Sequence, residues 1–78
     1  MVQEELNFNG NKLKEKREAA KKTQTEIAHF LEITPQSYGE MEKNQINPNS
    51  NNLAKLCIYF DCPVQEFFDI PAKFFAKI

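Results

Sequence analysis

The 78-residue chain is predicted to form one all-α domain, a compact five-helix bundle with a short extra helical turn at its C-terminus. Apolar residues recur at helical spacing along most of the chain, and several of these segments begin with residues that cap helices. The length allows a single domain with a modest core. The domain is expected to span residues 9–70, before an aromatic extension over residues 71–78. Residues 1–8 are expected to form a loose tail, although its Leu6 and Phe8 could pack onto the core.

The first helix is predicted over residues 11–22, because Leu13, Arg17 and Ala20 share one face at helical spacing. This segment holds six basic and two acidic residues, whereas residues 23–42 hold four glutamates and no lysine or arginine. Charge is therefore segregated along a chain whose net charge is −1. An acidic balance argues mildly against DNA binding, since most DNA-binding domains are basic.

The second helix begins at a strong local signal. Residues 23–26 read Thr-Gln-Thr-Glu, a capping box in which the Thr23 hydroxyl accepts from the Glu26 N–H and the Glu26 carboxylate reaches back. Ile27 and Leu31 follow at i and i+4, so they indicate an apolar stripe that faces the core.

The third helix has an equally clear start, with Thr34 as its N-cap and Pro35 as its first residue. Proline is favoured there because its missing N–H would have no partner within the helix. Tyr38 and Met41 are expected to face inward. Asn44 is expected to end the helix in the left-handed conformation.

Three shorter signals predict the remaining helical segments. Ser50 is expected to cap a fourth helix, and Pro63 to open a short fifth helix over residues 64–69. Pro71 is expected to open the final helical turn, which carries Phe74 and Phe75. The inner face of the fourth helix would hold Leu53, Leu56, Cys57 and Phe60.

The remaining chemistry-bearing residues exclude several classes of protein. Cys57 and Cys62 are expected to be buried free thiols, and His29, the single histidine, is expected on the surface. We expect no catalytic activity, no metal, no cofactor and no small-molecule substrate, because no nucleophile–base pair or ligand cluster is recognisable. Without a run of about 18 apolar residues or a signal peptide, no membrane contact and a cytoplasmic location are expected.

Only Glu32, Ile33 and Thr34 separate the second and third helices, which predicts a tight helix-turn-helix. At this point the sequence resembles the phage-repressor and Cro-like family, the Xre-type or lambda-repressor-like helix-turn-helix proteins. The resemblance covers roughly residues 13–68. It rests on the ordered set Arg17, residues 23–28, Leu31, Ile33, Thr34, Tyr38, Met41, Glu42, Asn47, Pro48, Leu53, Leu56 and Phe60.

The resemblance implies a sequence-specific regulator of transcription, with repression favoured, that binds a palindromic operator in double-stranded DNA as a homodimer. Residues 35–43 would be the recognition helix in the major groove. The positions that would face the bases are Pro35, Gln36, Gly39 and Glu40. A glutamine such as Gln36 can pair with adenine through two hydrogen bonds, and Glu40 could accept from cytosine N4.

The resemblance also assigns contacts to the DNA backbone and one internal ion pair. Gln24 would bind a phosphate at the start of the second helix, where free N–H groups favour anions. Arg17 and Glu42 would form a structural ion pair. The other predicted backbone contacts are Ser37, Lys43, Asn44, Gln45 and Asn47. Phosphate charge would be neutralised by Lys12, Lys14, Lys16, Lys21, Lys22 and Lys43.

Three residues depart from the family pattern. Glu32 stands where the turn commonly has glycine, so either it adopts a strained positive φ or the turn differs. Lys16 occupies a position that is often apolar. Gly39 either allows a close approach to the groove or is simply tolerated within the helix, where it costs about 1 kcal/mol relative to alanine.

Two alternatives to the DNA-binding interpretation stay open. A protein-interaction module on the same fold, such as an antitoxin or an assembly factor, would use the acidic helix-turn-helix to meet a basic partner. A structural mini-domain is a weaker alternative. The aromatic extension over residues 71–78 would either form a dimer contact or fold back onto the first and fourth helices.

Overall fold

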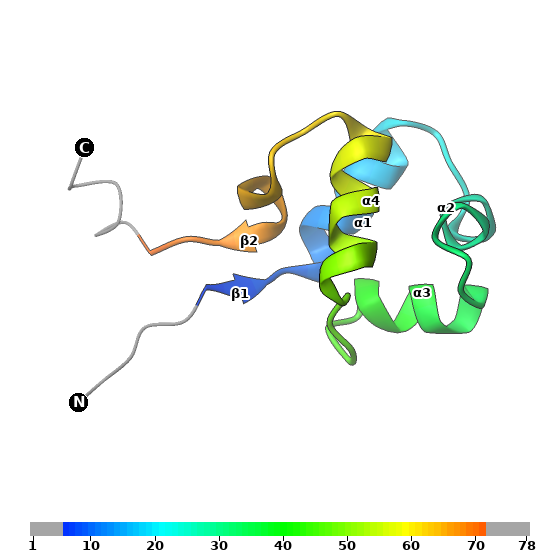
Figure 1. Cartoon of the computed structure of the whole chain (residues 1–78), viewed down its shortest axis with the longest axis horizontal. Coiled ribbons are helices and arrows are strands. Elements are labelled where there is room, and N and C mark those ends of the chain that lie inside the picture. The colour runs from blue at the N-terminus through cyan, green and yellow to red at the C-terminus, as the bar shows by residue number, and fades with distance from the viewer. Residues whose placement is uncertain (1–5, 72–78) are drawn as a thin grey trace.

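A computed structural model describes residues 6–71 of the chain, and this part is mostly helical (Figure 1). Four segments are α-helical, a fifth is a single 3-10 turn, and two very short strands pair with each other. The elements in chain order are β1 (Asn7–Phe8), α1 (Gly10–Ala19), α2 (Gln24–Leu31), α3 (Pro35–Glu42), α4 (Ser50–Phe60), η1 (Val64–Phe67) and β2 (Phe68–Asp69).

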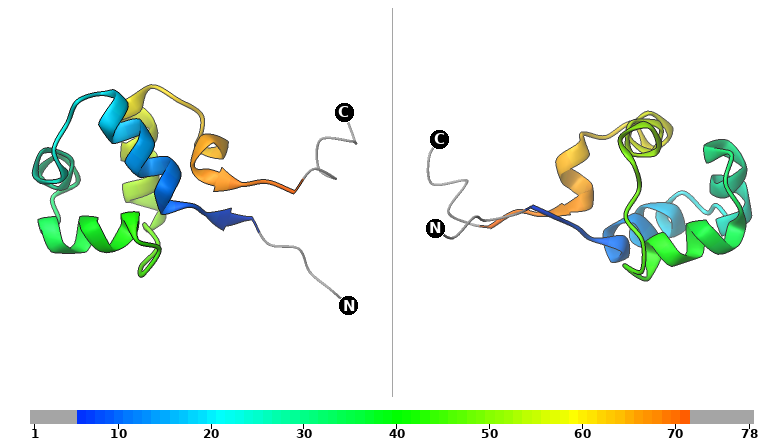
Figure 2. Two further views of the ribbon diagram at one scale, coloured as in Figure 1. Left: turned by 180° about the vertical axis from the view of Figure 1, so that it is seen from behind. Right: turned by 60° about the horizontal axis from the view of Figure 1, so that its bottom comes forward.

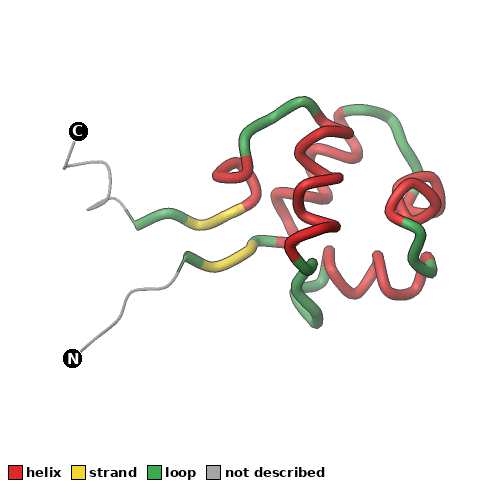
Figure 3. The backbone as a smooth tube through the Cα atoms, in the orientation of Figure 1, coloured by secondary structure: helices red, strands yellow, loops and turns green. Residues whose placement is uncertain are grey.

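The main correction to the predicted bundle concerns the two ends of the domain. In place of a fifth α-helix over residues 64–69, the chain makes η1 and then enters β2. The tail predicted as loose contributes β1, which pairs antiparallel with β2 so that Phe8 lies opposite Phe68. The two strands run side by side away from the helices (Figure 3). The predicted final turn over residues 71–78 lies almost wholly outside the described residues.

An aromatic cluster explains why both ends leave the predicted pattern. The Phe8 ring lies 5.9 Å from that of Phe68 and 6.5 Å from that of Phe67, measured between centroids. Phe67 is fully buried, and its carbonyl accepts a 2.8 Å hydrogen bond from the Asn9 backbone. Burying these rings outweighs helix propensity in segments this short. Leu6, in contrast, is 49% exposed.

The caps predicted for the second and third helices are confirmed. Thr23 and Glu26 form the complete capping box at the start of α2. At the start of α3, the Thr34 hydroxyl accepts from the Ser37 backbone at 3.0 Å, and Pro35 is the first helical residue. Each cap joins residues three positions apart, so it is specified by the local sequence alone.

Two helix ends differ from the predictions. Helix α1 ends at Ala19 and not at residue 22, because Lys21 takes a left-handed φ of 58° that turns the chain toward α2. Ala20 is the C-cap of α1 and is exposed. Helix α4 is capped by Asn49, whose side chain accepts from the Asn52 backbone at 2.8 Å. Ser50 is therefore the first residue of α4 and not its cap.

Every α-helix and η1 contribute to one core. Tyr38 and Met41 of α3 face inward as predicted, and Leu56 anchors α4. Cys57 and Cys62 are half-buried free thiols, so they are less enclosed than expected. The buried apolar residues are Leu13, Ile27, Ala28, Leu31, Tyr38, Met41, Leu56 and Phe67.

In the turn between α2 and α3, Glu32 adopts the strained positive φ that was one of the two alternatives for this residue. Glu32 has a φ of 61° and forms the left-handed C-cap of α2. Its N–H donates to the carbonyl of His29 at 3.1 Å, and the next N–H, from Ile33, donates to that of Ala28 at 3.0 Å. The turn therefore keeps the left-handed geometry that favours glycine, at an expected cost of about 1 kcal/mol.

The resulting corner sets α3 apart on one side of the molecule. In Figure 1, α2 is seen almost end-on while α3 runs across the view, so the two helices cross steeply. The views in Figure 2 also place α3 at one edge of the domain and the paired strands away from it. None of the helices within residues 6–71 combines the length and the apolar composition that a membrane span requires.

Candidate nucleic-acid interface

Helix α3 presents one face to the core and the opposite face to solvent. Tyr38, Met41 and Glu42 are buried, which fixes the rotation of the helix about its axis. Pro35 and Gln36 are consequently exposed. The other two residues predicted to read bases, Gly39 and Glu40, are half-buried. The outer face of α3 is thus open at its N-terminal end and partly shielded in its second half.

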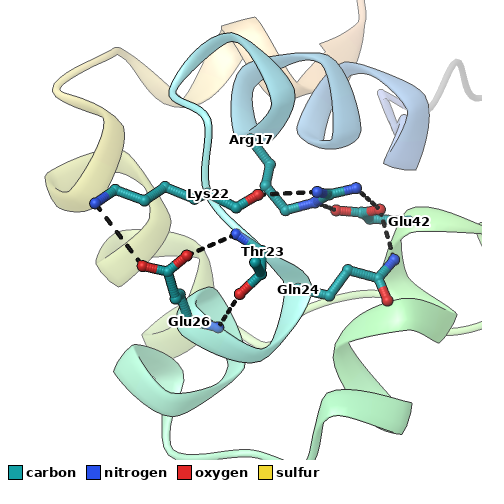
Figure 4. Close-up of polar contacts among 6 residues, drawn as sticks. All are labelled: Arg17, Lys22, Thr23, Gln24, Glu26 and Glu42. Atoms are coloured by element: carbon teal, nitrogen blue, oxygen red, sulfur yellow. Dashed lines mark hydrogen bonds and ion pairs between the residues drawn. The ribbon is translucent and has the colours of Figure 1, made fainter.

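Arg17 of α1 reaches Glu42, the last residue of α3, and the two side chains form an ion pair (Figure 4). Arg17 Nε donates to Glu42 Oε2 at 2.6 Å and Nη2 donates to Oε1 at 3.2 Å, while Nη1 donates to the Lys22 carbonyl at 3.0 Å. Gln24 Nε2 also donates to Glu42 Oε1 at 3.0 Å. The network ties α1, the start of α2 and the end of α3 together.

The carboxylate of Glu42 is almost fully buried, with 3% of its side chain exposed. Burial by itself raises the pKa of this group, but hydrogen bonds from Arg17 and Gln24 and the nearby Tyr38 hydroxyl favour the charged form, and the net pKa lies below its ordinary value. Glu42 is therefore an internal charge with its own counter-ion, and it does not add to the negative charge at the surface.

Tyr38 has a buried hydroxyl next to this network. Its oxygen makes no hydrogen bond of ordinary distance and angle with a described residue. It is nevertheless close enough to Glu42 to help lower the pKa of that carboxyl. The hydroxyl therefore acts on Glu42 through its dipole and remains without a hydrogen bond of its own among the described residues. Burial and the neighbouring carboxylate raise the pKa of Tyr38 far above its usual value.

Gln24 has a different environment from the one expected for a simple phosphate contact. One of its amide hydrogens binds Glu42, and its Oε1 lies over Gly39, 3.5 Å from where a Cβ of that residue would stand. The second amide hydrogen remains available. As the first residue of α2, Gln24 also has a backbone N–H without a partner inside the helix.

Asn44 connects the end of α3 to the start of α1, a contact that sequence reasoning missed. Its φ of 63° fits the predicted left-handed residue after the helix, but its side chain accepts a 2.8 Å hydrogen bond from the Gly10 N–H. A Cβ on Gly10 would lie 2.2 Å from the Met41 carbonyl oxygen. Glycine at this position is therefore required for the close approach of two backbones.

The other predicted backbone contacts lie around α3. Lys43, Gln45 and Asn47 are exposed in the segment that follows the helix. Ser37 is half-buried, and its hydroxyl accepts a 3.0 Å hydrogen bond from the Thr34 hydroxyl. Ser37 thus has a local partner, whereas the three loop residues are open to solvent.

The structure divides the lysines predicted to neutralise phosphate into two groups. Lys12 donates to the Phe68 carbonyl at 2.8 Å and lies 3.6 Å from Asp69, and Lys16 pairs with Glu66. These contacts hold α1 to η1 and to β2, and they explain why Lys16 departs from the apolar pattern. Lys22 lies 4.0 Å from Glu26. The lysines without an ion-pair partner among the described residues are Lys14, Lys21, Lys43 and Lys55.

Comparison with known proteins places this geometry in context. A family model described as "Helix-turn-helix" matches residues 13–67. The structure is also similar to a crystal structure of the restriction-modification controller protein C.AhdI from Aeromonas hydrophila, with a TM-score of 0.68 and 29% sequence identity. That match covers 76% of this chain and 86% of the other chain. No curated protein sequence matches.

Proposed function

Because this chain belongs to the helix-turn-helix family, we propose that it is a regulator of transcription that binds double-stranded DNA with α3 in the major groove. The similar solved structure belongs to a restriction-modification controller protein, which supports a regulatory role. We further propose that the protein recognises a specific DNA sequence, that it represses transcription, and that it is cytoplasmic. Pro35, Gln36, Gly39 and Glu40 would face the bases.

The observation that carries the proposal is the exposure of the N-terminal half of α3. Pro35 and Gln36 are open to solvent, while Tyr38 and Glu42 on the opposite face lock the helix to the core. A helix held in this way can enter the major groove without rearrangement of the domain. Gln36 is the strongest base-reading candidate, since its amide can pair with both N6 and N7 of adenine.

The four glutamates in residues 23–42 argue against DNA binding, and the ion pair between Arg17 and Glu42 weakens that argument. Glu42 is neutralised internally by Arg17, and Glu26 serves the capping box of α2. Glu40 remains on the partly shielded half of α3, where it could accept from cytosine N4. Two of the four glutamates in residues 23–42 therefore have local partners, and the phosphate-binding charge would be supplied by lysines on α1 and after α3.

The proposal is tested by selecting binding sites from a random DNA library with the full chain at two salt concentrations. We expect a palindrome to be enriched, and we expect Gln36→Ala to relax one base position and to weaken binding. A loss of about 1–3 kcal/mol corresponds to about a 5- to 150-fold change in affinity. Gln65→Ala removes an exposed glutamine of η1 and is the matched control. Unchanged binding by the Gln36 variant would exclude Gln36 as a reader.

A homodimer would place two copies of α3 about 34 Å apart on such a palindrome. Support for a second copy comes from the exposed apolar residues Ile58 of α4, 74% exposed, and Val64 of η1, 44% exposed. The aromatic extension over residues 71–78, the other candidate dimer contact, lies almost wholly outside the described residues. Sedimentation of Ile58→Asp against the unmodified chain tests whether the α4 surface contributes.

The competing function, a protein-interaction module, predicts a different result in the same selection. If no DNA sequence is enriched at either salt concentration, the acidic residues on α2 and α3 would instead suit a basic protein partner. Enrichment of a defined site supports DNA binding.

A further inference from the structure

The C-terminal end of α4 brings two cysteines together. Asp61, directly after the helix, takes a left-handed φ of 50°. Its N–H donates to the Ile58 carbonyl at 3.3 Å, and the N–H of Cys62 donates to the Cys57 carbonyl at 3.1 Å. These two bonds define a Schellman motif, in which the side chains at the positions of Cys57 and Cys62 commonly pack against each other.

The same motif ends all four α-helices of the described chain, and only at α4 do thiols occupy both paired positions. The corresponding pair after α2 is Ala28 and Ile33, whose backbones are joined by a 3.0 Å hydrogen bond. Ala28 belongs to the buried core and Ile33 packs against it. Cys57 and Cys62 likewise pack against the core. Both cysteine side chains therefore lie on the core side of their turn.

The surroundings of the two thiols allow them to react with each other. Each is a half-buried free thiol, so solvent still reaches it. Burial is the main cause that raises the pKa of both, and Cys57 is among the groups that raise the pKa of Cys62 further, as expected of neighbouring thiols. Within residues 6–71, no group of three or more His, Cys, Asp or Glu side chains could hold a metal ion. The pair is therefore better suited to redox chemistry than to a metal.

We infer that Cys57 and Cys62 form a modification site, a dithiol that a low-molecular-weight disulfide such as oxidised glutathione converts to an intramolecular disulfide. The thiolate of one cysteine attacks a sulfur of the small disulfide, whose S–S bond breaks and releases one small thiol. The second cysteine then attacks the protein sulfur of this mixed disulfide and releases the other small thiol. The two protons lost by the cysteines pass to the two leaving thiolates. The protein is thereby oxidised by two electrons, and the small disulfide is reduced by two.

This inference is independent of the proposed function. The disulfide would close a short loop around Asp61 and fix the junction between α4 and η1, which carries the exposed residues Ile58 and Val64. In the cytoplasm, the location proposed above, glutathione and thioredoxin keep such pairs reduced. The disulfide would therefore form under oxidising conditions, and thiol–disulfide exchange would reverse it.

The test equilibrates the folded full chain, and the same chain unfolded in urea, with buffers of reduced and oxidised glutathione. Acid-quenched samples are then analysed by intact mass, in which the intramolecular disulfide appears as the loss of two hydrogens. Because the folded backbone already holds the two residues together, the ratio of disulfide to dithiol should be about 10- to 100-fold higher in the folded chain than in the unfolded one. By the same linkage, the oxidised chain should have a higher midpoint of thermal unfolding.

Cys57→Ser and Cys62→Ser are the matched variants, since each keeps one thiol of the pair. Each should accumulate a mixed disulfide that adds one glutathionyl group, because the second thiol that would displace it is missing. Circular dichroism checks that both variants are folded, and Cys57→Ala and Cys62→Ala replace any serine variant that is not.

Three results would overturn the modification site. The folded unmodified chain could accumulate mixed disulfides, it could form disulfide-linked dimers in place of the intramolecular bond, or it could be oxidised no more readily than the chain in urea. DNA binding is not part of this measurement, so a failure of the proposed function would leave its outcome unchanged.

Discussion

Gly39 offers a direct test of how α3, the proposed recognition helix, is built. A glycine in the interior of a helix costs about 1 kcal/mol relative to alanine. In this structure a Cβ at position 39 would meet the Gln24 side chain at 3.5 Å, an ordinary van der Waals distance. The added methyl group therefore has room, and the helix should gain most of the propensity difference.

We expect Gly39→Ala to raise the free energy of unfolding by about 0.5–1 kcal/mol. For a domain of this size, each kcal/mol corresponds to a shift of about 4–8 °C in the midpoint of thermal unfolding. Circular dichroism during thermal and urea unfolding measures both quantities. Because the fold does not require glycine here, we expect the benefit of Gly39 to appear in DNA binding, so the more stable variant should bind its operator less tightly.

Gly10→Ala is the matched control, since it makes the same chemical change at the start of α1. A Cβ at Gly10 would stand 2.2 Å from the Met41 carbonyl oxygen and 2.6 Å from that of Glu42. These are backbone atoms that cannot rotate away, so destabilisation of about 1–3 kcal/mol or more is expected. If Gly39→Ala destabilised the domain, or Gly10→Ala were neutral, the reasoning about space around α1 and α3 would be wrong. Unchanged operator affinity in Gly39→Ala would show that Gly39 is merely tolerated.

Three further predictions concern the network beneath α3. Arg17→Met should destabilise the domain at neutral pH by about 3–5 kcal/mol, because Glu42 stays buried without a counter-ion, and the double variant Arg17→Met/Glu42→Met should recover most of this loss in urea unfolding. Equal stability of the single and double variants would argue against that cause. Tyr38→Phe should be neutral or slightly stabilising, since the hydroxyl it removes lacks a hydrogen bond of ordinary geometry; a loss above about 1 kcal/mol would mean that the hydroxyl does bind Glu42. Because the pKa of Glu42 is lowered on folding, its stabilising contribution should be present above the ordinary carboxyl pKa and lost as the pH falls from there through the folded-state pKa. Unfolding measured between neutral and acid pH should show a smaller acid loss in the double variant than in the unmodified chain.

The start of the helix-turn-helix could be predicted from the sequence because its determinants are local. Thr23 and Glu26 satisfy each other three residues apart, and Thr34 with Pro35 starts α3 in the same short-range way. Spacing of apolar residues then indicated which side of α3 faces the core. The contact between Arg17 and Glu42 was implied by the family resemblance and not by the spacing alone, and the structure places the two groups within hydrogen-bond distance.

Tertiary structure alone decided what lies at the two ends of the domain and how its lysines are used. The pairing of Phe8 with Phe68 involves strands of two residues each, too short to leave a periodic signal. Likewise, the neighbouring residues in the sequence do not distinguish Lys14 from Lys12. Lys14 nevertheless lines a hollow beside the end of α3, whereas Lys12 donates a hydrogen bond to the Phe68 carbonyl of β2. Caps and turns depend on neighbours within one helical turn, whereas these contacts join segments far apart in the sequence and arise only when the core brings them together.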